Sequence, residues 1–217
     1  MRAICYILML LPAALCVLYV RTFGVNVVFA DQWEMVPHFA RLANGQLSVS
    51  DLWAFHNEHQ LFFPRVVMIS LGSVTAWNNV AEMYFLVGCL AGSAVLLFVA
   101  FRKSLDEVRV RDLLVFVPVV WLVFSLRQHT NLLWGYQITF ALTQLACLAT
   151  LLLLYSGRWE RAGLREASVF SLALALGLVA SGSSAQGLLV WPAGLLLLAS
   201  AKVRREPCWS SGPRLER

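Results

Sequence analysis

Charge is scarce in this chain, and so are the patterns that mark disulfide-bonded or metal-binding proteins. Only 13% of its 217 residues are Asp, Glu, Lys or Arg, roughly half the share usual in soluble domains. The five cysteines show no paired spacing, so the sequence indicates neither a disulfide framework nor a zinc knuckle. The net charge of +5 comes from basic residues scattered at the ends of apolar runs, which argues against a nucleic-acid-binding patch.

Apolar residues take the place of charge: 59% of the chain is hydrophobic, and the mean hydropathy is +0.71. The excess forms four uncharged runs of 18, 19, 30 and 35 residues, bounded by Arg2 and Arg21, Glu82 and Arg102, Arg127 and Arg158, and Glu166 and Lys202. A helix needs about 20 apolar residues to cross a bilayer, so these runs predict an all-α integral membrane protein with about six transmembrane helices. We expect the spans at about 4–21, 80–101, 112–127, 136–155, 167–181 and 187–201.

Two apolar segments depart from this simple pattern. The span at 112–127 has an uncharged core of only 14 residues, so Arg127 has to extend toward the headgroups. The stretch 66–76 is too short for a crossing and ends at Trp77. Counting it as a span would reverse every later loop, so we expect a helix that lies in the membrane interface.

The distribution of basic residues predicts that both ends of the chain are cytoplasmic. With the N-terminus inside, thirteen of the seventeen Lys and Arg residues fall in cytoplasmic segments, as the positive-inside rule requires. All four histidines then lie on the extracytoplasmic side. We interpret the chain as one membrane domain, with a first span at 1–21, an exported loop at 22–79, a helical bundle at 80–201 and a cytoplasmic tail at 202–217.

A cleaved signal peptide is the alternative for the N-terminus, since Val28-Phe29-Ala30 resembles a cleavage site. The apolar core is long for a signal peptide, and that site lies well beyond its end. An uncleaved anchor is therefore favoured. In either case the loop 22–79 is exported.

The exported loop opens with the acidic motif Asp31-Gln32-Trp33-Glu34. Asp31 and Glu34 have the spacing of a capping box in front of an amphipathic helix that stops at Asn44-Gly45. Pro37 argues against capping by Asp31, because it would lie past the first turn of that helix. A helix that starts near Pro37 leaves both carboxylates available. We take Asp31 and Glu34 as candidate catalytic residues, while capping stays open, most of all for Glu34.

A second polar motif, His56-Asn57-Glu58-His59-Gln60, is followed by apolar residues and Arg65. It places acid, base and cation at the edge of an apolar surface, an environment typical of functional sites. In an extended segment His56 and Glu58 would share one face and His59 would lie on the other. We take Glu58, His59 and Arg65 as candidate substrate-binding residues and His56 as a weaker one. The alternative is a solvated loop whose Arg65 contacts lipid phosphate.

A third group of polar residues lies in the short loop that follows the third predicted span. Arg127 and His129 supply cationic and hydrogen-bonding groups, and Gln137 follows at the start of the next span. An amide in that position usually faces protein or a water-filled cavity, so all three are candidate substrate-binding residues. We interpret Trp134 and Tyr136 as part of an interfacial aromatic belt.

This arrangement resembles the GT-C class of integral-membrane glycosyltransferases. The resemblance rests on one span, a long exported loop that opens with DQWE, an interfacial helix, HNEH followed by Pro64-Arg65, and a bundle of further spans. It looks particularly like bacterial membrane proteins with a "DxW…HNEHR…PR" signature, except that Gln60 stands where Arg is expected. The resemblance covers about residues 1–140.

The resemblance implies inverting transfer of a sugar from a polyprenyl-phosphate carrier to an extracytoplasmic acceptor at the bacterial inner membrane. It gives Asp31 the role of general base. Glu58 and His59 match positions that contact the donor phosphate or a divalent metal ion, and Arg65 and Arg127 would balance the charge of the departing phosphate. The implied partners are the lipid-linked sugar donor and membrane lipid, with no nucleic acid.

Two other functions stay open at this point. A transporter or flippase for a lipid-linked anionic substrate would use the same polar cluster as a gate, although transporters usually place ionisable groups near the middle of their spans. A non-catalytic, truncated membrane partner is the third candidate. Members of the GT-C class usually have more spans than this chain, and they often carry a soluble C-terminal domain.

Overall fold

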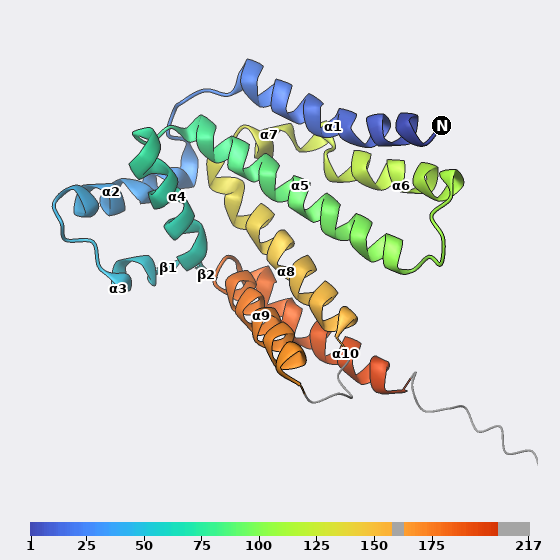
Figure 1. Ribbon diagram of the computed structural model, residues 1–217. Coiled ribbons are helices and arrows are strands. Elements are labelled where there is room, and N and C mark those ends of the chain that lie inside the picture. Colours follow the sequence, from blue (N-terminus) through green and yellow to red (C-terminus); the bar gives the residue numbers. More distant parts are fainter. Residues whose placement is uncertain (158–162, 204–217) are drawn as a thin grey trace, which may run out of the picture.

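The computed structural model describes residues 1–157 and 163–203, which are almost entirely helical (Figure 1). Helices lie at each of the predicted spans: α1 (Arg2–Phe23), α5 (Asn79–Lys103), α6 (Val110–Val123), α8 (Ile138–Ser156), α9 (Leu164–Ser181) and α10 (Val190–Val203). The all-α prediction is confirmed. The tail predicted after residue 203 and the basic residues Arg158 and Arg161 lie outside the described residues.

Four described segments are long and apolar enough to cross a membrane: Arg2–Phe23, Asn79–Lys103, Gly135–Ser156 and Leu164–Ser181. Helices α6 and α10 have only 14 residues each. Among the described residues, four of the six predicted spans are therefore long enough to cross a membrane. Apolar side chains on α1 are widely exposed, with Ile7 at 63%, Leu10 at 69% and Leu18 at 56%. Such a surface needs lipid or another apolar partner to cover it. The chain is a membrane protein.

The helices pack as a bundle in which α1, α5 and α6 lie side by side and α8 leads to the pair α9 and α10 (Figure 1). Two hydrogen bonds join α1 to α6: the Cys16 thiol donates to the Phe124 carbonyl at 3.3 Å, and Trp121 Nε1 donates to the Leu8 carbonyl at 3.0 Å. Between α5 and α8, a methyl group added at Gly92 would meet Leu145 at 3.0 Å. Small residues therefore allow these helices to approach closely.

The segment between α1 and α5 forms a subdomain at the end of the bundle where α1 ends and α5 begins (Figure 1). Its elements are η1 (Ala30–Glu34), α2 (Met35–Ala43), α3 (Val49–Leu52), β1 (Phe55–His56), β2 (His59–Gln60) and α4 (Phe62–Thr75). Helix α4 ends at Thr75 and covers all but the last residue of the helix predicted at 66–76. Short elements also join the later helices: η2 (Leu126–Gln128), α7 (His129–Leu132), η3 (Gly135–Gln137) and η4 (Ala185–Leu189).

The capping box that was the alternative interpretation of Asp31 and Glu34 is not formed. Residues 30–34 are a 3-10 helix, α2 starts at Met35, and neither Asp31 nor Glu34 makes a side-chain cap hydrogen bond. Pro37 is then the third residue of α2, inside the first turn, where its missing N–H leaves no hydrogen bond unmade. The helix stops at Ala43, and Gly45 adopts a φ of 66°, as the sequence predicts.

The expectation of an extended segment at His56–His59 is wrong. Strands β1 and β2 pair antiparallel with His56 opposite His59, so the chain reverses at Asn57 and Glu58. Asn57 has a φ of 51°, which Asn tolerates better than most residues. The reversal separates His56 from Glu58, which lies exposed at the turn.

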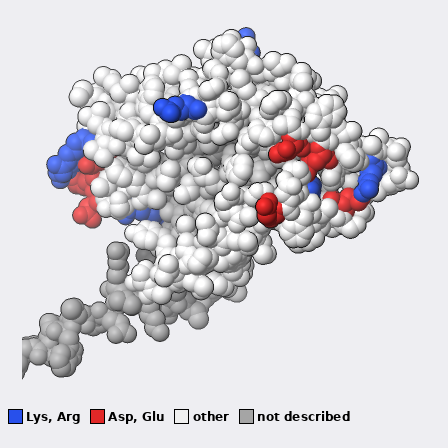
Figure 2. Space-filling model, turned by 180° about the vertical axis from the view of Figure 1, so that it is seen from behind, with Lys and Arg blue, Asp and Glu red and all other residues white. Residues whose placement is uncertain are grey.

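Charged side chains gather at opposite ends of the molecule. Figure 2 shows acidic groups together with basic atoms toward one edge and a second mixed basic and acidic group at the other. The first edge belongs to the subdomain that contains η1, and the second to the region where α1 begins and α5 ends.

Candidate functional site

The 3-10 conformation of η1 determines the directions in which its polar side chains project. A 3-10 helix has three residues per turn, so side chains at i and i+3 lie above one another. Asp31 and Glu34 therefore project from one face, while Gln32 projects about 120° away. The two carboxylates differ in exposure: the side chain of Asp31 is 55% exposed and that of Glu34 is 16% exposed.

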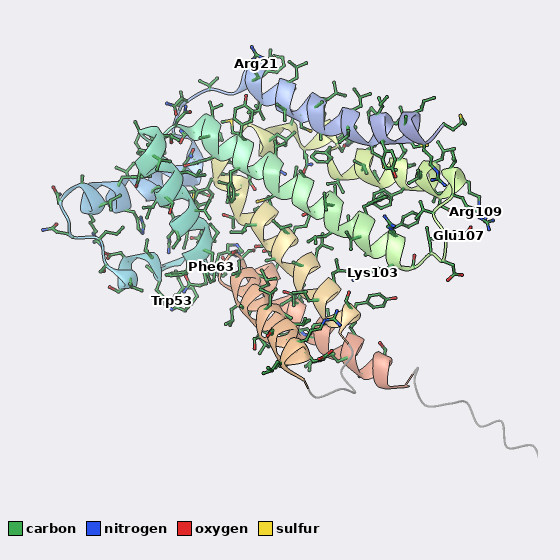
Figure 3. All side chains as sticks on the ribbon, viewed as in Figure 1. Arg21, Trp53, Phe63, Lys103, Glu107 and Arg109 are labelled. Carbon is green, nitrogen blue, oxygen red and sulfur yellow. The ribbon has the colours of Figure 1, made fainter. Side chains whose placement is uncertain are left out.

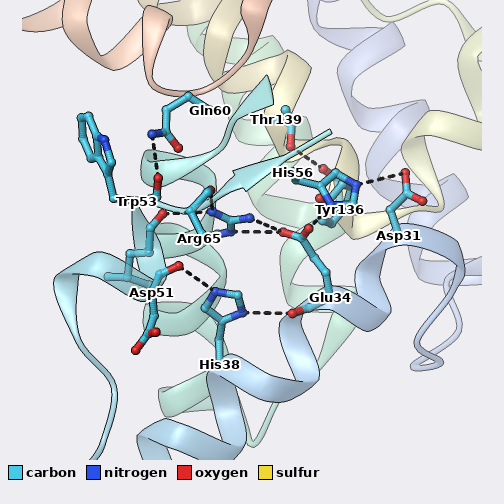
Figure 4. Close-up of polar contacts among 12 residues, drawn as sticks. Asp31, Glu34, His38, Asp51, Trp53, His56, Gln60, Arg65, Tyr136 and Thr139 are labelled. Carbon is cyan, nitrogen blue, oxygen red and sulfur yellow. Dashed lines mark hydrogen bonds and ion pairs between the residues drawn. The ribbon is translucent and has the colours of Figure 1, made fainter. Parts of the chain in front are cut away.

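Arg65, in the first turn of α4, holds Glu34. Its Nε and Nη2 atoms both donate to Glu34 Oε1, at 3.1 and 3.0 Å, and its Nη1 donates to the carbonyls of Leu52 and Ala54 (Figure 4). The Arg65 side chain is only 3% exposed. A buried guanidinium is tolerated where a carboxylate and hydrogen bonds compensate its charge. Arg65 thus fastens η1 to the segment that leads into the hairpin.

His56 reaches the same carboxylate from the hairpin. Its Nδ1 contacts Glu34 Oε2, and because a carboxylate only accepts hydrogen bonds, Nδ1 carries a proton. Its Nε2 lies 4.0 Å from Asp31 Oδ2, is buried, and has no hydrogen-bond partner among the described residues (Figure 4). We call Asp31, Glu34, His56 and Arg65 the loop cluster.

Tyr136 closes the loop cluster from the side of η3. It is 6% exposed, and its ring centroid lies 6.0 Å from that of His56 in an edge-on arrangement. Its hydroxyl is buried beside the carboxylate of Glu34, which interacts with it. Tyr136 is therefore an interior residue, and the interpretation of it as part of an interfacial belt is wrong. Its neighbour Trp134 is partly exposed and donates to the Phe29 carbonyl at 3.2 Å.

The three candidates after α6 are not joined to the loop cluster. Arg127 and His129 are exposed, and among the described residues their side chains form no hydrogen bond or ion pair with it. Gln137 is 9% exposed in η3, next to Tyr136. Of these three, Gln137 alone lies in η3, the element that places Tyr136 against His56.

Glu58 and His59, the predicted contacts of a divalent metal ion, lie in the hairpin. Glu58 is exposed at the hairpin turn, and His59 Nδ1 accepts a hydrogen bond from the Ala185 N–H at 3.3 Å. Within residues 1–157 and 163–203, no three His, Cys, Asp or Glu side chains form a group that could hold a metal ion. The divalent cation that the resemblance implies at Glu58 and His59 therefore stays a prediction.

Gln32, between the two acidic residues of η1, enters a second polar group. Its Nε2 donates to Glu82 Oε2 at 2.5 Å and to Asn79 Oδ1 at 2.9 Å. All three residues are 1% exposed. A methyl group added at Gly135 would lie 2.4 Å from Glu82 Oε2, so the backbone of η3 covers the carboxylate directly. We call Gln32, Asn79 and Glu82 the helix-end cluster.

Sequence reasoning missed the helix-end cluster. Glu82 served only to mark the end of an apolar run, and Gln32 was a spacer within the acidic motif. The available signal is the position of Glu82 itself, since an ionisable residue inside an apolar helix calls for a partner. Nothing in the local pattern identifies Gln32 as that partner, because the two are fifty positions apart.

Asp51 stabilises the remainder of the subdomain. Hydrogen bonds from the Ser48 hydroxyl at 2.7 Å and the Ser48 N–H at 2.9 Å hold the pKa of Asp51 below its usual value, and Arg41 beside it acts in the same direction. Ser48 and Asp51 form a capping box at the start of α3. His38 Nδ1 and Nε2 lie 2.9 and 3.1 Å from the Glu34 and Asp51 carbonyls. These contacts join α2 to α3 beneath the loop cluster.

Comparisons with known proteins identified no relative of this chain. No protein-family model, no curated protein and no solved structure matches the chain.

Proposed function

We propose that the chain is a membrane glycosyltransferase of the GT-C type. It moves a sugar from a polyprenyl-phosphate carrier to an acceptor hydroxyl by inverting transfer, with Asp31 as the general base. The positive-inside distribution supports an extracytoplasmic position for the loop cluster, at a bacterial inner membrane. The observation that carries the proposal is the difference between the two carboxylates of η1: one is bound by Arg65 and His56, and the other is open.

The open carboxylate is the one suited to proton transfer. Asp31 is 55% exposed, and its nearest charged neighbour in the cluster is His56 at 4.0 Å. A general base has to reach the proton that it removes, which an exposed side chain can do. Glu34 has both oxygens engaged by Arg65 and His56. In the proposal Glu34 is therefore a positioning residue, and Arg65 supports Glu34 instead of contacting the departing phosphate.

The reaction needs one bond to form and one to break. The acceptor oxygen attacks the anomeric carbon while the bond from that carbon to the carrier phosphate breaks. The hydroxyl proton passes to Asp31, and the electron pair of the broken bond leaves with the phosphate. The imidazole Nε2 of His56 lies 4.0 Å from the carboxylate that takes the proton.

The position of the loop cluster in the fold suits a lipid-linked donor. It lies beyond the end of α1 and close to the start of α5, both of which are long enough to cross a membrane. A carrier whose tail stays in the bilayer presents its phosphate at this level. A water-soluble donor would require no such placement.

Transfer by the purified protein tests the proposal. The measurement uses a polyprenyl-phosphate-linked sugar with a labelled sugar group and follows its loss from the carrier. Asp31→Asn keeps the shape of the side chain and removes the base, so the rate should fall about 100-fold or more. Asp106→Asn, at an exposed position in the α5–α6 loop, should leave the rate unchanged. Equal rates for wild type and Asp31→Asn would contradict the role of Asp31.

Transport of a lipid-linked anionic substrate is the second candidate, and Glu82 is the observation that favours it. Ionisable groups buried within spans mark substrate or proton paths in many transporters, and Glu82 is 1% exposed in the first turn of α5. A flux assay in vesicles separates the two functions. Transport predicts flux that Glu82→Gln abolishes and Asp31→Asn leaves intact.

A further inference from the structure

A polar cavity lies at the opposite end of the bundle from the loop cluster. It has a volume of about 530 Å³ and is lined by Arg2, Arg102, Leu105, Asp106, Glu107, Val108 and Arg109. Three elements meet there: α1 begins, α5 ends, and α6 begins. Figure 3 shows Arg109 and Glu107 at this end, and Figure 2 shows the mixed charges gathered there. The proposed transfer reaction uses none of these residues.

Three guanidinium groups face two carboxylates in this cavity, and their donors are largely available. Arg2 uses one N–H on the Val108 carbonyl at 3.3 Å. Arg109 lies 3.9 Å from Glu107, and both side chains are mostly exposed, at 61% and 79%, so this pair is weak. Arg102 forms no ion pair within the described residues. An anion that enters the cavity therefore meets a positive balance of charge.

The start of α1 adds backbone donors to the same cavity. Among the described residues, no side chain forms a cap hydrogen bond at the start of this helix. Helix α6 likewise has no side-chain cap hydrogen bond, and the N–H of Arg109 before it donates to Asp112 Oδ2 at 2.9 Å. Open N–H groups and the positive end of the helix dipole favour an anion beside Arg2.

The chemistry of these donors points to phosphate. Guanidinium groups form paired hydrogen bonds with phosphate oxygens, and α1 and α5 are candidate spans whose ends lie where lipid headgroups lie. We propose that this cavity binds a phosphate-bearing anion through Arg2, Arg102 and Arg109. The headgroup of an anionic phospholipid in the adjoining leaflet is one source of that anion, and soluble phosphate is the other.

Binding of short-chain phosphatidylglycerol to the purified full chain in nonionic detergent tests the proposal. The readout is lipid retention by native mass spectrometry, together with the rise in thermal unfolding midpoint that a ligand of the folded state produces. Loss of one charged hydrogen-bond donor should weaken binding about tenfold in Arg102→Gln. The double variant Arg2→Gln/Arg102→Gln should lose about 100-fold.

The matched control is Arg165→Gln, which removes the same charge from an exposed position on α9 outside the cavity. It should bind the lipid as the wild type does. Inorganic phosphate added as a competitor distinguishes the sources: displacement at concentrations similar to those of the lipid assigns the site to soluble phosphate, and no displacement assigns it to the headgroup. The proposal is overturned if Arg102→Gln and Arg165→Gln weaken binding equally, or if neither has an effect. Because Arg102 is exposed, an unchanged unfolding midpoint without lipid confirms that the variant folds.

Discussion

Neighbouring residues of the short helix η1 enter the loop cluster and the helix-end cluster, and these two clusters differ in their exposure to solvent. Asp31 points into the loop cluster, where its side chain is 55% exposed, and Gln32 points into the helix-end cluster, where all three residues are 1% exposed. The loop cluster contains four ionisable side chains, of which that of Asp31 is exposed to solvent. The helix-end cluster contains a single carboxylate covered by the backbone of η3.

This difference in solvent exposure determines which property of the protein each cluster affects. A buried group whose partners are fixed contributes to a unique packing arrangement, whereas an exposed carboxylate beside a fixed ion pair can change its protonation at little structural cost. The helix-end cluster attaches η1 to α5, and the loop cluster leaves Asp31 accessible at the surface of that attachment. Substitutions in the two clusters should therefore have different signatures, one in stability and the other in activity.

The largest effect on stability is expected from Arg65→Leu. The change leaves Glu34 and the carbonyls of Leu52 and Ala54 without their common partner, and breaking a buried ion pair in this way costs about 3–5 kcal/mol. Arg41→Leu is the control, since Arg41 is 52% exposed in its pair with Asp51 and should cost at most about 1 kcal/mol. Thermal or denaturant unfolding in detergent measures both. Equal destabilisation would show that Arg65 does not hold the loop cluster together.

A smaller loss is expected from Gly135→Ala, which probes the closed cluster. The added methyl group would lie 2.4 Å from Glu82 Oε2 and 2.7 Å from Glu82 Cβ, and forcing extra volume into a packed site costs about 1–3 kcal/mol. Gly88→Ala, in the middle of α5 where nothing lies within 4 Å of the added atom, should be neutral or stabilising by up to about 1 kcal/mol. If both variants unfold at the same temperature, η3 does not cover Glu82 as described.

The smallest expected effect is the pH dependence that Asp51 confers on the subdomain. Its pKa is lowered in the folded state by Ser48 and Arg41, so its contribution to stability is present above the unfolded pKa. That contribution is lost as the pH falls through the folded pKa. The unfolding midpoints of wild type and Asp51→Asn should therefore differ at neutral pH and converge in acid. A difference that grows in acid would have the wrong sign.

Local sequence patterns predicted the helices and much of the subdomain, but not the partners of its polar residues. Apolar runs locate the spans because a bilayer demands length and hydropathy, and Pro37 correctly argued against an Asp31 cap. The hairpin at Asn57 was missed, because reversal there depends on one residue adopting a positive φ. Contacts such as Gln32 with Glu82 and His56 with Tyr136 join residues far apart in the sequence, so no local periodicity contains them.

The assignment of separate roles to the two acidic residues of η1 is the central claim, and paired kinetics with stability tests it most directly. Asp31→Asn and Glu34→Gln are compared in the same sugar-transfer assay and in the same unfolding experiment. Asp31→Asn should unfold like the wild type but transfer at least about 100-fold more slowly, whereas Glu34→Gln should unfold at a lower temperature. A stable Glu34→Gln protein without activity, beside an active Asp31→Asn protein, would contradict this assignment.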